Sequence, residues 1–223
     1  MTTSEKQFIE QAAPEYWYSY AHELADTADT IYDMSKDQWI GYAINHADGS
    51  KQSYSRPLVS RPVLLMYGLS FENLIKALLI SEDPTLLNGG KLSKHLLGHD
   101  LVKLANRLKT LRLNTEEQGL LALLSDVVPY QGRYPVPRTA QDLKPEKYVS
   151  QEIHKACKAL FGRLEMQLYR LNYEGIDAPE GVRFPNLRLT HLDSEADFIN
   201  EEHKSDLMGL LREFQKGDVK ESR

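Results

Sequence analysis

The strongest candidates for a chemical role in this chain are two arginines in a loop that contains two prolines. The loop reads Gly132-Arg-Tyr-Pro-Val-Pro-Arg138, and its prolines restrict the backbone. A restricted loop loses little entropy on binding, and the planar guanidinium group pairs well with phosphate oxygens. We therefore predict that Arg133 and Arg138 bind phosphate. The alternative is a stiff connector in which Arg133 bonds to the ends of helices.

The charged pair Glu72 and Lys76 is a second candidate, because it interrupts the apolar stretch Val63–Ile80. A segment that is apolar on almost every side belongs in the centre of a helical domain. Charges on such a helix need partners, so the pair predicts a binding role beside the arginine loop. The alternative is an ordinary intrahelical pair on a solvated stripe or at a dimer seam, which contributes about 0.2–0.5 kcal/mol when exposed.

The region from Lys91 to Arg112 is locally basic and could extend a phosphate-binding surface. From it we select Lys103 and Arg107 as further binding residues. The alternative is a solvated helix face that the acidic C-terminal segment neutralises. The charged residues of the region are Lys91, Lys94, Lys103, Arg107, Lys109 and Arg112 against Asp100 alone.

The sequence contains no complete motif for binding a metal or a cofactor. His95 and His99 are four residues apart, but Gly98 lies between them and no third ligand motif follows. His99 is better explained by hydrogen bonding at a helix start. The single cysteine, Cys157, excludes an intramolecular disulfide and a multi-cysteine zinc site. We predict no metal and no cofactor.

Composition indicates a soluble globular protein without a global attraction to nucleic acid. The chain has 223 residues, a net charge of −5 and 41% hydrophobic residues, which is enough for a substantial core. The N-terminus lacks the pattern of a secretory signal, and Glu72, Asn73 and Lys76 argue against a membrane span in the apolar stretch. We predict a cytoplasmic location and no membrane partner.

The apolar periodicity predicts an all-α fold, an antiparallel bundle of four to five helices. Asp48-Gly49 favours a small β-hairpin over residues 39–55, with a loop and short helix as the alternative. We divide the chain into a helical bundle over residues 1–172, an irregular crossing over 173–193, and an acidic helix and tail over 194–223. The expected helices cover residues 14–34, 61–80, 100–111, 115–128 and 147–172. Thr115–Gln118 is a capping-box pattern at the start of the fourth.

Three segments in order carry a resemblance to a known family. They are Gly68-Leu-Ser-Phe-Glu-Asn-Leu-Ile-Lys-Ala-Leu-Leu79, Gly98-His-Asp-Leu-Val-Lys-Leu-Ala105 and Gly132-Arg-Tyr-Pro135. Over residues 60–172 the chain resembles the HEPN (higher eukaryotes and prokaryotes nucleotide-binding) helical domains. The resemblance implies a homodimeric helical bundle that binds RNA, nucleotide or a protein partner, in a defence or toxin–antitoxin setting.

Nuclease members of that family carry an Arg followed, after four to six residues, by a His that moves the proton while the Arg stabilises charge on the phosphate. Here the positions after Arg133 hold Arg138, Thr139 and Ala140. We therefore expect a non-catalytic binding module. The alternative is a divergent metal-independent ribonuclease that uses Arg133 with His154 or His99.

Overall fold

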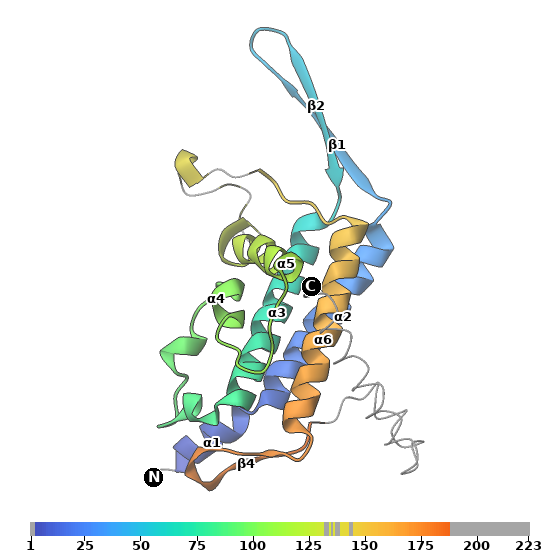
Figure 1. Cartoon of the computed structure of the whole chain (residues 1–223). Helices are drawn as coiled ribbons and strands as arrows, with labels where there is room; N and C mark the ends of the chain where they lie inside the picture. The colour runs from blue at the N-terminus through green and yellow to red at the C-terminus, as the bar shows by residue number, and fades with distance from the viewer. Residues whose placement is uncertain (1–2, 132–133, 135, 137–138, 143–144, 188–223) are drawn as a thin grey trace, which may run out of the picture. The chain divides into compact units, whose positions relative to one another are not determined.

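A computed structural model describes residues 3–131, 134, 136, 139–142 and 145–187 (Figure 1). The described part is mainly helical and includes a two-stranded antiparallel hairpin, as predicted. The C-terminal helix expected after residue 194 lies outside the described residues, as do Arg133 and Arg138. The elements are α1 Thr3–Gln11, α2 Pro14–Ser35, β1 Trp39–Asn45, β2 Lys51–Pro57, α3 Ser60–Glu82, α4 Leu101–Ala105, α5 Thr115–Asp126, α6 Gln151–Asn172, β3 Ile176–Asp177 and β4 Arg183–Phe184.

Helix α3 is the innermost helix, which confirms the reading of the apolar stretch. It packs against α2, α4, α5 and α6, and Figure 1 shows it running beside α2 and α6. Tyr67, Phe71 and Leu74 are among the side chains that it buries completely. By length and composition α3 could also cross a membrane, but most of it is buried inside the protein, as in the core helix of a soluble protein.

Hydrogen bonds made by polar side chains show how the three long helices run relative to one another. Ser70 Oγ on α3 donates to the carbonyl oxygen of Ala21 on α2 over 2.7 Å. At the start of α3, Ser60 Oγ accepts the N–H of Val149, which lies just before α6. At the end of α3, Ser81 Oγ accepts a hydrogen bond from Nδ2 of Asn172, the last residue of α6, over 2.8 Å. Helix α6 therefore runs parallel to α3. Helix α2 runs antiparallel to α3, because Asp29, which follows Ala21 in α2, bonds to Tyr67, which precedes Ser70 in α3.

Capping residues determine where α5 and α6 begin. The predicted capping box is wrong by one residue, because Asn114 rather than Thr115 is the cap. Asn114 Oδ1 accepts the N–H of Glu117, and Glu117 accepts the N–H of Asn114 in return, each over 2.8 Å. Helix α6 begins at Gln151 and not at 147, because Ser150 caps it.

Helix α4 is shorter than predicted and ends at Ala105. The reason is tertiary: the Glu82 carboxylate at the end of α3 accepts the backbone N–H groups of Lys109 and Thr110 over 2.8 and 2.9 Å. Backbone donors held by a carboxylate cannot bond to a carbonyl within a helix. The chain therefore leaves the helix before these residues.

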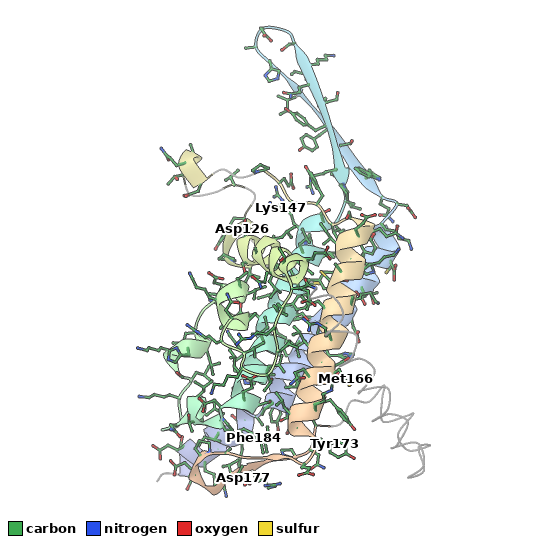
Figure 2. All side chains as sticks on the ribbon, viewed as in Figure 1. Asp126, Lys147, Met166, Tyr173, Asp177 and Phe184 are labelled. Atoms are coloured by element: carbon green, nitrogen blue, oxygen red, sulfur yellow. The ribbon has the colours of Figure 1, made fainter. Side chains whose placement is uncertain are left out.

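The β1–β2 hairpin projects beyond the helices, and its side chains beyond the base are exposed (Figure 2). Asp48 Oδ1 accepts the N–H of Ser50 at the turn, where Gly49 adopts a φ of +84° that side-chain-bearing residues disfavour. The predicted hairpin is confirmed, and pairing extends to Pro57. In the segment expected to be irregular, β3 and β4 form a two-residue antiparallel ladder.

Candidate functional site

Helix α3 carries two polar clusters on different sides. The first contains Glu72 and Lys76, which are only 6% and 7% exposed. Lys76 Nζ donates to Glu72 Oε1 over 2.6 Å, and Glu72 Oε2 lies 2.9 Å from Nδ1 of His99. The Lys76 ammonium also lies 5.7 Å from the centre of the Trp17 ring, which places it for a cation–π contact.

These contacts bear on the alternative interpretation of the charged pair, whereas the binding role of Glu72 and Lys76 stays a prediction. The solvated stripe is wrong, because Glu72 and Lys76 are buried within one chain and satisfied by it. Asp100 caps α4 by accepting the N–H of Lys103, and the ring of the preceding His99 bonds to Glu72. In the first cluster Glu72 and Lys76 are thus largely shielded from solvent, whereas the His99 side chain at its edge is 57% exposed.

The second cluster joins α2, α3 and α6 and was not recognised in the sequence. Tyr67 Oη donates to Asp29 Oδ1, and it lies 2.6 Å from His154 Nδ1. Lys158 Nζ donates to the other oxygen of Asp29 over 2.5 Å. The ring of Tyr32 stacks on the His154 ring with 4.0 Å between centres. Side chains from three helices therefore hold the imidazole in one orientation.

Burial sets the protonation of this cluster. It lowers the pKa of His154 below its usual value, although the nearby Asp29 carboxylate opposes the shift. Burial, followed by the hydrogen bond to Asp29, raises the pKa of Tyr67. At neutral pH, His154 is therefore a neutral imidazole and Tyr67 keeps its proton.

A cleft of about 740 Å³ lies over the second cluster, at the base of the hairpin. The end of α2, the hairpin base and the beginning of α6 surround it, and we refer to it as the hairpin-base cleft. Its lining includes two exposed aromatic rings, lysines from two helices, and the histidine of the cluster below. Among the lining residues are Tyr32, Lys36, Trp39, Tyr148, His154 and Lys155.

The structure separates the two histidines that the sequence offered as nuclease candidates. His154 lines the cleft and contacts Tyr67, whereas His99 is bound to Glu72, five residues further along α3. Five residues correspond to a rotation of about 140° around a helix. His154 and His99 therefore belong to different sites.

Lys103 and Arg107 lie in and just after the short helix α4, in a more acidic neighbourhood than the sequence indicated. Lys103 Nζ pairs with Asp100 over 3.0 Å on the surface, and Arg107 donates to the backbone oxygen of His95. Glu82 and Asp83 from the end of α3 share a small hollow with Arg107. The phosphate-binding role of Lys103 and Arg107 stays a prediction.

Within the described part of the chain, no group of three or more His, Cys, Asp or Glu side chains has the geometry of a metal site. Comparison with family models, curated proteins and solved structures gives no significant match for this chain. The class of protein therefore has to be inferred from its own residues.

Sequence reasoning identified His154 but missed Asp29, Tyr67 and Lys158. These residues lie far apart in the chain, on α2, α3 and α6, and none belongs to a recognisable motif. The one local signal was the four-residue spacing of His154 and Lys158, which places both on one face of α6.

Proposed function

We propose that this protein is a HEPN-like helical bundle that binds RNA or a nucleotide, and that the ligand occupies the hairpin-base cleft. The observation that supports this most is the combination, in one hollow, of flat exposed rings with ammonium groups. Trp39 and Tyr148 are 63% and 42% exposed, although aromatic rings of this size are usually buried to a greater extent. Base stacking on an exposed aromatic ring contributes about 1–3 kcal/mol per base.

The charges around the cleft favour phosphate over a cationic ligand. The cleft lining contains Lys36, Lys155 and Lys158 against Asp33 and Asp37, whereas the whole chain carries −5. Lys36 forms an ion pair with Asp33, and Lys158 forms one with Asp29. Lys155 is exposed and has no ion pair among the described residues. The first turn of α6, a long helix, adds its positive dipole end beside these lysines.

The binding proposal is tested with a fluorescently labelled single-stranded RNA and anisotropy. The variant combines Trp39→Ala with Lys155→Glu, which removes a stacking ring and reverses a charge in the cleft. We expect its dissociation constant to rise at least tenfold, since about 1.4 kcal/mol is a factor of ten. The control combines Tyr20→Ala with Lys6→Glu, an exposed ring and an exposed lysine elsewhere on the helices.

Equal affinity of the cleft variant and the wild type would remove the cleft from the binding site. The arginine loop is tested in the same titration with Arg133→Ala combined with Arg138→Ala. A tenfold loss there, with the cleft variant unaffected, would move the site to the loop. Losses in both variants would indicate one surface that includes the loop and the cleft.

A divergent ribonuclease is the second candidate function, and the position of His154 favours it. A neutral imidazole at the wall of a nucleotide-sized cleft can accept a proton, as a general base must. The test is incubation of purified protein with total RNA in the presence of a chelator. Cleavage that disappears in His154→Ala but persists in His99→Ala supports the enzyme. Absence of cleavage by the wild type supports the binding module.

Partners and location are proposed on the same resemblance. We propose a cytoplasmic homodimer in a defence or toxin–antitoxin setting, with a protein partner as an alternative ligand. Light scattering of the purified protein measures the oligomeric state directly. A pull-down with residues 194–223 deleted tests whether the acidic C-terminal segment holds a partner, because an unchanged set of partners would exclude that role.

A further inference from the structure

The bond between Tyr67 and Asp29 determines which atom of His154 carries the proton. Asp29 accepts from Lys158 through one oxygen and from Tyr67 through the other. The proton in the Tyr67–Asp29 bond is the phenol's own, because Tyr67 is its donor. The Tyr67 hydroxyl has no second proton to donate.

The contact between Tyr67 Oη and His154 Nδ1, 2.6 Å long, must therefore use a proton from the histidine. In a neutral imidazole only one nitrogen carries a proton, so Nδ1 is the donor and Nε2 is left with a lone pair. Tyr32, stacked on the ring, prevents it from turning away. Asp29 and Tyr67 are thus positioning residues that fix the histidine as an acceptor at Nε2.

We infer that Nε2 is accessible from the cleft, because the ring lines the cleft and this nitrogen is not sealed in the core. The His154 side chain is 10% exposed and belongs to the cleft lining. Among the described residues, the one sealed side-chain polar atom that lacks a partner is Nε of Arg170, so Nε2 of His154 is not enclosed in the core without a partner. The cleft therefore presents a fixed acceptor that a ligand can satisfy.

We propose that His154 Nε2 accepts a hydrogen bond from the ligand and that the hairpin-base cleft consequently selects ribonucleotides over 2′-deoxyribonucleotides. This rests on the proposed function, namely that the cleft binds a nucleotide or RNA. An acceptor is satisfied only by an O–H or N–H group. The ribose 2′-hydroxyl is a donor that is present whatever the base, and DNA lacks it. A ligand without that donor leaves Nε2 desolvated and unpaired.

The experiment compares labelled single-stranded RNA with the 2′-deoxy oligonucleotide of the same sequence, with uracil kept in both, at pH 7.5. We expect the wild type to bind the RNA about two- to tenfold more tightly, the effect of one hydrogen bond. His154→Asn is the key variant, because its amide N–H can replace Nδ1 in the bond to Tyr67 while the acceptor at Nε2 is lost. Its RNA-to-DNA affinity ratio should fall to about one, because RNA loses a hydrogen bond and DNA no longer leaves an acceptor unpaired.

Tyr67→Phe tests the positioning role separately. It frees Nδ1, so the proton can move to Nε2, and the affinity ratio should again fall even though His154 is present. Thermal unfolding of each variant, with far-UV circular dichroism, verifies that the fold is retained. A uniform loss of affinity for both oligonucleotides in these variants would indicate a merely structural role and overturn the inference.

The experiment distinguishes failure of the proposed function from failure of the proposed ribose selectivity. If the wild type binds neither oligonucleotide, the proposed function is wrong and the inference falls with it. If it binds both equally, and His154→Asn also binds both equally, the function stands and the ribose selectivity is overturned. An RNA preference that His154→Asn retains would place the selective group elsewhere, which also overturns the inference.

Discussion

Replacing Glu72 by Ala is expected to lower the free energy of unfolding by about 3–5 kcal/mol, one of the two largest losses expected for a single substitution in this chain. Lys76 would be left as an uncompensated ammonium in the core, where its second neighbour is the Trp17 ring. His99 would lose its bond as well. Chemical denaturation followed by circular dichroism measures the loss.

A double variant separates the cost of an orphaned charge from the value of the pair. Glu72→Leu combined with Lys76→Met removes both charges while it keeps similar volumes. Replacing a buried pair by apolar residues is often neutral or stabilising by about 1–4 kcal/mol, so we expect the double variant to be at least as stable as the wild type. A first control is Asp100→Ala, which breaks the exposed pair with Lys103.

The control is expected to cost more than a simple surface pair, because Asp100 also caps α4. Lys103→Ala, which breaks the same pair but keeps the cap, should change stability by less than about 0.5 kcal/mol. If Glu72→Ala costs no more than Lys103→Ala, the charged pair is accessible to water, contrary to the structure.

Phe71→Ala is the second large effect, with an expected loss of about 3–5 kcal/mol. Phe71 is completely buried on α3, and its ring meets the Phe161 ring of α6 edge to face, with 6.3 Å between centres. Its removal leaves a cavity between two long helices that cannot close without moving one of them. Denaturation with urea gives the value.

Tyr20→Ala serves as the comparison, since this ring is on α2 but exposed. Its effect should lie within about 0.5 kcal/mol. Similar losses for Phe71→Ala and Tyr20→Ala would mean that α3 is not the centre of the protein, and the assignment of both polar clusters to the interior would then be wrong.

The sequence contained most of the information on the helices, because their signals are local. Helix α3 has more apolar residues than are needed to cover one face of a helix, so its central position was predictable from the sequence alone. The hairpin was predictable for the same reason, since the turn at Asp48-Gly49 selects antiparallel pairing over a few residues. Helix ends were less predictable: α4 stops at Ala105 because Glu82, far away in the chain, binds the backbone that comes after it.

The charged residues show the limit of local patterns. The spacing of Glu72 and Lys76 is the same on a wet surface and in a core, and the sequence could therefore suggest a pair but not its burial. The tertiary structure decided that the pair is enclosed, with His99 and Trp17 as its neighbours.

By itself, the sequence determined a mainly helical protein with one innermost helix, a hairpin and no complete metal or nuclease motif. Only the tertiary structure brought Asp29, Tyr67 and His154 together from three helices beneath one cleft. The physical reason is that helix formation depends on neighbours three and four residues apart, whereas a site depends on which helix faces pack together. The packing of α2 and α6 against α3 is encoded across the whole chain, and no short pattern contains it.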